Sequence, residues 1–443
     1  MSTVAMLVIN PMTNDTRVDK EAASLASDGH DVTVIAVAAD GVPQREPRDG
    51  FTIVRLPYRR IAKQAVVAPL NRARARRDQA TRSLEAVGNA GMRARLTNWG
   101  HAGSMAAGHA VRAAGGMGLR IARTRQLELD YWHSIASRVL DIVPRPDIVH
   151  AHDLGTLAAA ARIAARTPSP RRPRVVYDSH ELYVEQQTKW LPRERRMWAV
   201  HERHWIPRAD AVITVSPGIA AELQRRYRLA ETPTLVLNTP PRETVSSPAA
   251  LPAGMAPDLR AELDVGDVPL AVYVGTVKPG RGVDRLLPAM QHEPWHLALV
   301  GAGTSDHVAQ VVREANSMGI RDRLHVVPPV PAPLLPSWIA SADVGVHPME
   351  PTCMNHELAL PNKLFDYVFA GLPVAVSDLP EMAAMVLGND LGTVFDPADP
   401  ATVAQQVGVA ASMDHGRASD DLLAELSWER QTTRLQRLYR GLE

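Results

Sequence analysis

Cysteine is almost absent from this chain of 443 residues, because Cys353 is the only one. A single cysteine excludes an intramolecular disulfide, so a reducing compartment is the simpler assumption. Long apolar runs are also missing, and no stretch is long enough to cross a bilayer as an apolar helix. The first residues lack the basic segment and the long apolar run of a secretory signal. We therefore expect a cytoplasmic protein, with a place at the inner face of the cell membrane left open.

A net excess of charge is also missing, since 49 Lys and Arg residues stand against 48 Asp and Glu residues. The distribution is uneven, because arginines crowd the segment from Arg55 to Arg125, where Asp78 and Glu85 are the only acids. This basic insertion suits anionic lipid headgroups or a lipid-phosphate carrier, and equally a solvated helical hairpin covering a sheet. Nucleic-acid binding is disfavoured, because neither stacking aromatic residues nor a known motif accompanies the charge.

The length exceeds one ordinary core and predicts two domains of about 200 residues each. Short apolar runs alternate with helical patterns throughout, which is typical of parallel sheets with right-handed crossovers. In the first half we expect strands at Val4–Ile9, Val32–Val37, Thr52–Leu56, Asp147–His150, Arg174–Tyr177, Ala211–Val215 and Thr234–Leu237. In the second half we expect them at Leu270–Val274, His296–Val300, Leu324–Val327, Val344–His347 and Val374–Val376.

Helices are expected between these strands. The first spans Arg17–Asp28, with Thr16 and Asp19 as a capping box and Gly29 at its end. Later helices are expected at Val283–Gln291, Ser305–Gly319, Pro333–Ala342 and Leu364–Ala370. A proline-rich connection then separates domain 1–240 from domain 269–425, and an amphipathic helix closes the chain at 426–443. The predicted fold class is α/β, with two tandem Rossmann-like, doubly wound domains and a cleft between them.

Glycines and basic residues follow the strands of the second half, where open parallel sheets bind their ligands. Gly275 comes directly after a strand, with Lys278 and Arg281 close behind it. Glycine lets backbone N–H groups approach a phosphate, and the two cations could neutralise it. The alternative is a flexible turn with solvated cations. Gly303 marks a second, weaker turn of the same kind.

The strongest signal is a helix that begins at Pro361 or Asn362. Unpaired N–H groups of Lys363 and Leu364 would then point at a ligand, and the positive end of the helix dipole suits a diphosphate. Asp366 lies one turn further, where its carboxylate could accept hydrogen bonds from ribose hydroxyls. The alternative is an ordinary helix start with a solvated acid.

Histidines and acids end two strands of the first half. We expect His150 and His152 on opposite faces of their strand, one packed inward and the other facing the crevice. His180 and Glu181 end the next strand in a similar way. The spacings match no zinc pattern and no cysteine is near, so no metal site is expected.

Several motifs occur in a fixed order along the chain: Asn14–Val18, Glu21–Ala22, Gly29–Val32, Asp147–Asp153, Ala209–Ser216, Gly280–Asp284, Pro361–Tyr367 and Gly371–Val374. Through them the chain resembles the retaining GT-B glycosyltransferases of glycosyltransferase family 4, over essentially its whole length. The resemblance implies transfer of a sugar from a nucleotide diphosphate donor to an acceptor hydroxyl with retention, in polysaccharide, glycolipid or other glycoconjugate biosynthesis. It implies no cofactor beyond the nucleotide sugar, and a sugar, lipid-linked or small-molecule acceptor.

The resemblance also assigns roles to residues. Arg281 takes the place of the family's diphosphate-binding basic residue, and His152 that of the histidine near the transferring sugar. Asp366 stands where the family has the second acid of its E-x7-E motif. Leu358 occupies the position of the first acid, and Glu357 lies one residue away. By this resemblance His152, Arg281 and Glu357 are the catalytic candidates.

Two further departures concern the ends of the first strand of each domain. Thr276 stands where many members have a second phosphate-binding arginine. Asp15 and Arg17 occupy the place of the usual Gly-Gly turn, and they either contact a substrate or pair with each other. Together with His180 and Glu181, they are the candidates on the acceptor side.

No Asp-x-Asp pair occurs in the chain, although enzymes that clamp a diphosphate with Mg²⁺ need acidic ligands. Arg281, Lys363 and the helix start would instead stabilise the charge of the leaving diphosphate. Two alternatives stay open, a sugar-nucleotide epimerase on the same fold and a non-catalytic partner protein. A dehydrogenase is disfavoured, because Asn10–Thr13 is no Gly-x-Gly-x-x-Gly turn.

Overall fold

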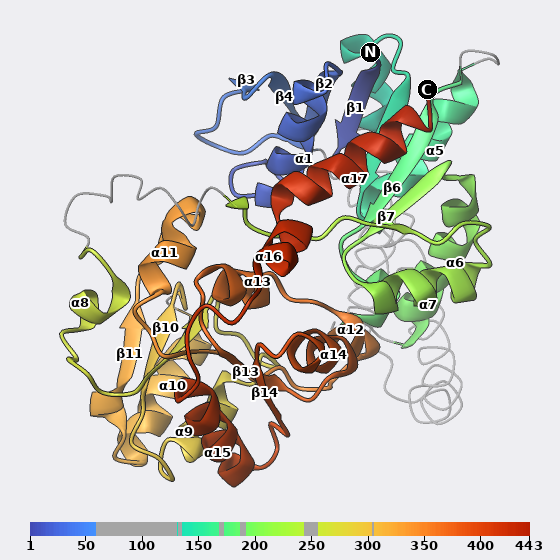
Figure 1. Cartoon of the computed structure of the whole chain (residues 1–443). Coiled ribbons are helices and arrows are strands. Elements are labelled where there is room, and N and C mark those ends of the chain that lie inside the picture. Colours follow the sequence, from blue (N-terminus) through green and yellow to red (C-terminus); the bar gives the residue numbers. More distant parts are fainter. Residues whose placement is uncertain (59–130, 132–134, 168–171, 187–191, 243–255, 304) are drawn as a thin grey trace, which may run out of the picture. The chain divides into compact units, whose positions relative to one another are not determined.

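The computed structural model describes residues 1–443 except 59–130, 132–134, 168–171, 187–191, 243–255 and 304 (Figure 1). The chain divides into two compact units. The first unit holds Met1–Tyr177 and Lys189–Asp210, and the second holds Asp178–Thr188 and Ala211–Glu443. Nearly all of the basic insertion expected from Arg55 to Arg125 lies outside the described residues.

One sheet contains eight strands in the order β3-β4-β2-β1-β5-β6-β7-β8. Their bounds are β1 (Thr3–Leu7), β2 (Asp31–Val37), β3 (Arg45–Arg48), β4 (Phe51–Leu56), β5 (Ile148–His152), β6 (Arg174–Ser179), β7 (Ala211–Thr214) and β8 (Thr234–Leu235). Strand β1 pairs in parallel with β2 and β5, β2 with β4, and β7 with β8, whereas β3 is antiparallel to β4. The strand order reverses between β1 and β5.

The helices of the first unit are α1 (Thr16–Ser27), α4 (Val139–Ile142), α5 (Leu154–Arg166) and α6 (Pro192–Trp205), with the 3₁₀ helices η1 (Ala136–Arg138) and η3 (Ile206–Arg208). The expected capping box of Thr16 and Asp19 is wrong. Asp15 caps α1 instead, because its carboxylate accepts the N–H of Val18 at 3.2 Å. Asp19 is therefore available to pair with Arg48 at 2.8 Å.

The second sheet lies within the second unit and has the order β11-β10-β9-β12-β13-β14, with parallel pairing throughout. Its strands are β9 (Leu270–Val274), β10 (His296–Val300), β11 (Leu324–Val327), β12 (Val344–His347), β13 (Val374–Ser377) and β14 (Gly392–Phe395). This is the strand order of a doubly wound nucleotide-binding sheet, and the order reverses between β9 and β12.

Helices cover both faces of the second sheet. One face packs against α9, α10 and α15, and the other packs against α11, α13 and α14. The helices of this unit are α7 (Pro217–Tyr227), α8 (Leu259–Leu263), α9 (Val283–Ala289), α10 (Asp306–Ser317), α11 (Leu335–Ile339), α12 (Met354–Leu358), α13 (Asn362–Phe369), α14 (Pro380–Gly388), α15 (Pro400–Ala411), α16 (Asp420–Leu426) and α17 (Trp428–Arg440). Short 3₁₀ helices are η2 (Tyr183–Glu185), η5 (Arg321–Arg323) and η6 (Ala332–Leu334).

The C-terminal helix α17 is hydrogen-bonded to the segment that follows β8. The side-chain oxygen of Gln431 accepts the N–H of Leu237 at 3.2 Å, and the N–H of Trp428 donates to the carbonyl of Pro240 at 3.0 Å. In the part of the chain that the structure describes, no helix combines the length and the apolar character that a membrane crossing needs.

Candidate active site

In the second sheet, backbone pairing is short between the two strands at which the strand order reverses. Strands β9 and β12 pair through two residues each, in the first part of both strands. Beyond these pairs, the hydroxyl of Tyr367 on α13 accepts the N–H of Val274 at 2.9 Å and donates to the carbonyl of Val346 at 3.1 Å. The phenol thus satisfies backbone groups of both strands and fixes α13 at the carboxyl end of the sheet.

Gly345 on β12 makes room for this ring. A Cβ atom at that position would lie 2.3 Å from the ring of Tyr367, far inside van der Waals contact. Only a residue without a side chain therefore lets α13 approach the sheet so closely.

Basic and aromatic side chains gather at this place. We call Tyr273, Arg281, His347, His356 and Lys363 the switch-point cluster; they come from β9, the loop after β9, the end of β12, α12 and α13. The ammonium of Lys363 lies 3.8 Å from the centroid of the Tyr273 ring, an attractive cation–π arrangement. The Tyr273 and His347 rings have centroids 6.2 Å apart and an angle of 29° between their planes.

Burial and mutual repulsion disfavour positive charge in this cluster. Burial holds the pKa of Lys363 well below its ordinary value; Arg281 lowers it further, while Asp366 raises it. Burial also lowers the pKa of His347 strongly, followed by the effects of Lys363 and Arg281. The pKa of the buried Tyr273 hydroxyl is raised to about 12, so the ring stays neutral. An anion placed here would relieve the repulsion among the cations.

Two glycines shape the loop that brings Arg281 to the cluster. Gly275 and Gly282 have φ values of 105° and 71°, which residues with a side chain rarely adopt. A Cβ atom at Gly275 would lie 3.6 Å from the ammonium of Lys363, and one at Gly282 only 1.7 Å from the carbonyl oxygen of Pro348. The loop backbone therefore passes directly against the cluster and against the residues that follow β12.

The other predicted donor residues lie around this cluster. Lys278 and Gly303 are exposed, and Asp366 is half-buried on α13. The side chain of Leu364 belongs to the apolar core, and its N–H donates to the carbonyl of Pro361 at 3.0 Å. The expectation of an unpaired N–H at Leu364 is therefore wrong, because Pro361 closes the first turn of the helix.

Helix α12 carries Glu357, which is half-buried, and Asn355, which was not among the predicted site residues. The Asn355 side-chain oxygen accepts the N–H of Leu182 at 2.7 Å, and its NH₂ group donates to Glu181 at 3.3 Å. The hydroxyl of Ser216 donates to the last carbonyl of α12 at 2.5 Å. These bonds join α12 to the residues after β6 and β7, all within the second unit.

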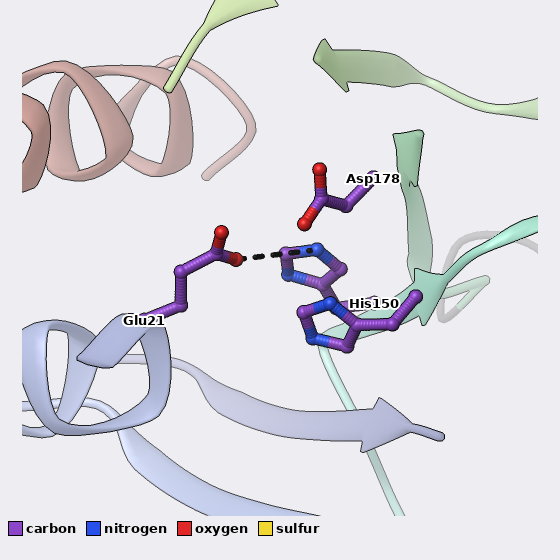
Figure 2. A group of neighbouring side chains, drawn as sticks. Glu21, His150 and Asp178 are labelled. Carbon is purple, nitrogen blue, oxygen red and sulfur yellow. Dashed lines mark ion pairs between the residues drawn. The ribbon is translucent and has the colours of Figure 1, made fainter. Parts of the chain in front are cut away.

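A buried polar group lies in the first unit at the end of β5 (Figure 2). Arg17 pairs with Glu21 at 3.0 Å, and the second oxygen of Glu21 lies 3.8 Å from the Nε2 atom of His150. The rings of His150 and His152 stack, with centroids 4.3 Å apart and 12° between their planes. The expectation of opposite faces is wrong, because residues two apart on a strand point to the same face.

Metal-binding residue types occur in this group. Glu21, His150 and His152 have ligand atoms within 4.8 Å of one another. Carboxylates and imidazoles bind zinc and similar ions. The guanidinium of Arg17 lies 3.0 Å from the Glu21 carboxylate, however, and its charge opposes a cation there. The expectation of a metal-free enzyme stays a prediction.

The remaining acceptor-side candidates have local partners. Asp15 accepts a hydrogen bond from the side chain of Asn10 at 2.7 Å in addition to capping α1. The Nε2 atom of His180 lies 2.9 Å from the carboxylate of Asp178. Asp153, between β5 and α5, has a φ of 61°, an uncommon conformation for a residue with a side chain. Such strain is often found at functional sites.

Two family models match the sequence. The model described as Glycosyl transferases group 1 matches residues 268–412, and the model described as Glycosyltransferase Family 4 matches residues 100–240. Together the two matches span more than half of the chain.

Named relatives share part of the sequence. The D-inositol 3-phosphate glycosyltransferase of Xylanimonas cellulosilytica is 27% identical over 290 residues, or 61% of this chain and 65% of that protein. A GDP-mannose-dependent alpha-(1-6)-phosphatidylinositol monomannoside mannosyltransferase of Mycolicibacterium smegmatis is 27% identical over 164 residues, or 34% of this chain and 42% of that protein. The chain thus spans less than two thirds of the length of either relative.

Solved structures share the fold of the whole chain. Sucrose-phosphate synthase from Thermosynechococcus elongatus has a TM-score of 0.70 at 17% identity, covering 100% of this chain and 99% of that one. HepE from Anabaena in complex with UDP-glucose has a TM-score of 0.64 at 13% identity, covering 100% of both chains. The two sheets, the structural neighbours and the family matches agree, so the chain has the GT-B fold and contains a group 1 and a family 4 glycosyltransferase domain.

Proposed function

We propose that this glycosyltransferase moves a sugar from a nucleoside diphosphate donor to an acceptor hydroxyl with retention of configuration and without a metal ion. The observation that supports the proposal is the switch-point cluster. Its cations lie at the carboxyl ends of β9 and β12, beside the start of α13. Doubly wound sheets bind nucleotides at this reversal of strand order.

The charges suit the departure of a nucleoside diphosphate. Negative charge grows on the diphosphate as the bond to the sugar breaks, and fixed cations and amide dipoles stabilise it without reorganisation. Arg281 and Lys363 supply the cations in this proposal, and the start of α13 supplies the dipole. In this proposal the ribose hydroxyls donate hydrogen bonds to Asp366, which is half-buried one turn into α13.

We also propose classes of donor and acceptor. One solved neighbour binds UDP-glucose, and one relative is named for GDP-mannose, so sugars of UDP and GDP are the first candidates as donors. Both relatives are named for inositol compounds, and we propose a polyol of this kind as acceptor in glycolipid or related glycoconjugate synthesis. Contact of the basic insertion with the inner face of the membrane stays a prediction.

Thermal unfolding with a panel of nucleotide sugars tests the proposal. UDP, GDP, ADP and dTDP sugars are added with EDTA or with Mg²⁺, since a ligand that binds the folded state raises the melting temperature. We expect one base to stabilise the protein equally in both conditions. Binding to none of them, or binding only with Mg²⁺, would overturn the proposal.

Product analysis separates the alternative activities. The stabilising donor is incubated with D-inositol 3-phosphate, other polyols or no acceptor, and the anomeric configuration of any product is read by NMR. A glycosyltransferase forms a glycoside with the configuration of the donor. Epimerisation of the donor in the absence of acceptor would identify an epimerase, and binding without turnover would favour a non-catalytic partner.

A further inference from the structure

His347 ends strand β12 and is fully buried, and no sequence motif marks it as a functional residue. Among the described residues, neither of its ring nitrogens has a hydrogen-bond partner. Buried polar side chains in folded proteins are nearly always hydrogen-bonded, so an unsatisfied imidazole calls for an explanation. The imidazole would be satisfied if a ligand brought a hydrogen-bonding group to it, or if ligand binding caused it to take up a proton.

Basic side chains from three elements act on this imidazole. Lys363 on α13, Arg281 in the loop after β9 and His356 on α12 all disfavour a positive charge on His347. The ring of Tyr273 on β9 packs beside it and carries no charge at neutral pH. His347 therefore lies near three basic side chains.

Two acidic residues raise the pKa values of basic residues next to His347. Asp366 raises the pKa of Lys363, but burial lowers that pKa more. Glu350 raises the pKa of His356, and its carbonyl oxygen lies 2.8 Å from the Nδ1 atom of that ring, but burial again has the larger effect. The carboxylate of Glu350 pairs with Arg285 at 2.7 Å.

We propose that His347 takes up a proton when the nucleoside diphosphate binds, so that the switch-point cluster gains positive charge as its ligand arrives. The inference rests on the proposed function and adds a property that neither the fold nor the family assignment requires. The bond formed is between a proton from bulk solvent and a ring nitrogen of His347, and no bond between heavy atoms forms or breaks.

The direction of the effect follows from charge. In the free protein the pKa of His347 lies well below its ordinary value, and so does that of Lys363. A diphosphate beside them raises both pKa values, because opposite charge favours the protonated forms. The affinity for the donor is therefore highest below the pKa values of the free protein. It falls as pH rises from those values to the higher pKa values of the complex, by about tenfold per pH unit for each full proton taken up.

Calorimetry measures this proton uptake directly. UDP-glucose or GDP-mannose, whichever the wild type binds, is titrated at one pH in PIPES and in Tris, two buffers with different heats of ionisation. These donors carry no phosphate group that titrates near neutral pH, so the ligand itself contributes no proton. The dependence of the observed heat on the buffer gives the number of protons bound. We expect net uptake in the wild type.

His347→Gln is the decisive variant, because glutamine keeps a polar side chain of similar size but cannot titrate. We expect a smaller proton uptake and a shallower loss of affinity with rising pH, whereas His415→Gln, which changes an exposed histidine of the same unit, leaves both unchanged. NMR of the His347 ring nitrogens in wild-type protein, with and without donor, gives the same answer should the variant fold poorly.

The outcomes are distinct. Donor binding without proton uptake, or with equal uptake in His347→Gln, or an imidazole that stays neutral in the wild-type complex, would overturn the inference and leave the proposed function standing. Absence of binding by any nucleotide sugar would overturn the proposed function, and the inference with it.

Discussion

The proposed function makes Arg281 the residue whose loss should affect catalysis most directly. We expect Arg281→Ala to lower kcat/KM by about 100- to 1,000-fold, or roughly 3–4 kcal/mol, because one fixed donor to the leaving group is lost. Asp366→Ala should lower kcat/KM by a similar factor, because the ribose would bind more weakly. Steady-state kinetics with saturating acceptor measure both effects. Arg313→Ala, which removes an exposed arginine of α10, serves as the control. Unchanged kinetics in the first two variants would contradict the site.

His201 on α6 predicts a pH dependence of stability in the first unit. Burial lowers its pKa to about 4, from 6.5 in the unfolded chain, and Arg162 and His204 add to the effect. The folded state therefore resists protonation; stability is complete above the unfolded pKa and is lost as pH falls toward the folded one. We expect a lower urea midpoint for this unit at pH 5 than at pH 7. The difference should shrink in His201→Gln, and an equal difference in both proteins would exclude this origin.

Some residues of the candidate site were predictable from sequence and others were not. Arg281 and Lys363 stand out because basic residues follow a strand and begin a helix, a pattern that the chain shows directly. His347 reads as the end of an apolar strand, and only the packing of two strands and two helices around it makes it notable. The shared face of His150 and His152 follows from strand geometry alone, so the prediction of opposite faces was an avoidable error.

At the level of elements, the approach of α13 to β12 depends on Gly345. We expect Gly345→Ala to lower the free energy of unfolding of the second unit by about 1–3 kcal/mol or more, because a buried methyl group would overlap the ring of Tyr367. Urea unfolding followed by a probe in this unit measures the loss. Gly388→Ala is the matched control, since a Cβ atom at the end of α14 would meet no atom within 4 Å. Equal stability of the two variants would show that α13 can shift without cost.

The strands of the second sheet were predicted well because they are buried on both faces and read as apolar runs. The bounds of β9, β10, β11 and β12 match the prediction residue for residue. Strand β3 was missed, since Arg45–Arg48 consists of three charged residues and a proline and pairs only at the edge of its sheet. Strand β14 was also missed, because it begins with a glycine and is short. Helix α8 lies within the predicted proline-rich connection, where its length of five residues gives little periodicity.

At the level of the whole molecule, donor binding should change hydrogen-exchange rates mainly in the second unit. We expect the bound donor to slow hydrogen exchange several-fold in segments 275–282 and 361–366, which hold the glycine loop and the start of α13. Strands β2 and β4 of the first unit provide an internal control and should exchange at unchanged rates. Mass spectrometry of proteolytic peptides resolves these regions. Protection confined to the first unit would contradict the placement of the donor.

The fold class and the family could be read from sequence, because both follow from repeated patterns and from motifs in order. The fine arrangement could not, since it depends on contacts between distant residues. Asn355 is an example: its amide joins residues more than 170 positions apart, and no local pattern marks it.

The path of the chain between the units limits how the protein can be divided. Residues 178–188 belong to the second unit although residues on both sides of them belong to the first. No single cut in the gene therefore yields two fragments that each contain one whole unit. A fragment ending near residue 240 would separate β7 and β8 from the rest of the second unit, although both strands belong to the eight-stranded sheet. Separate expression of either half calls for grafting the short excursion or for circular permutation.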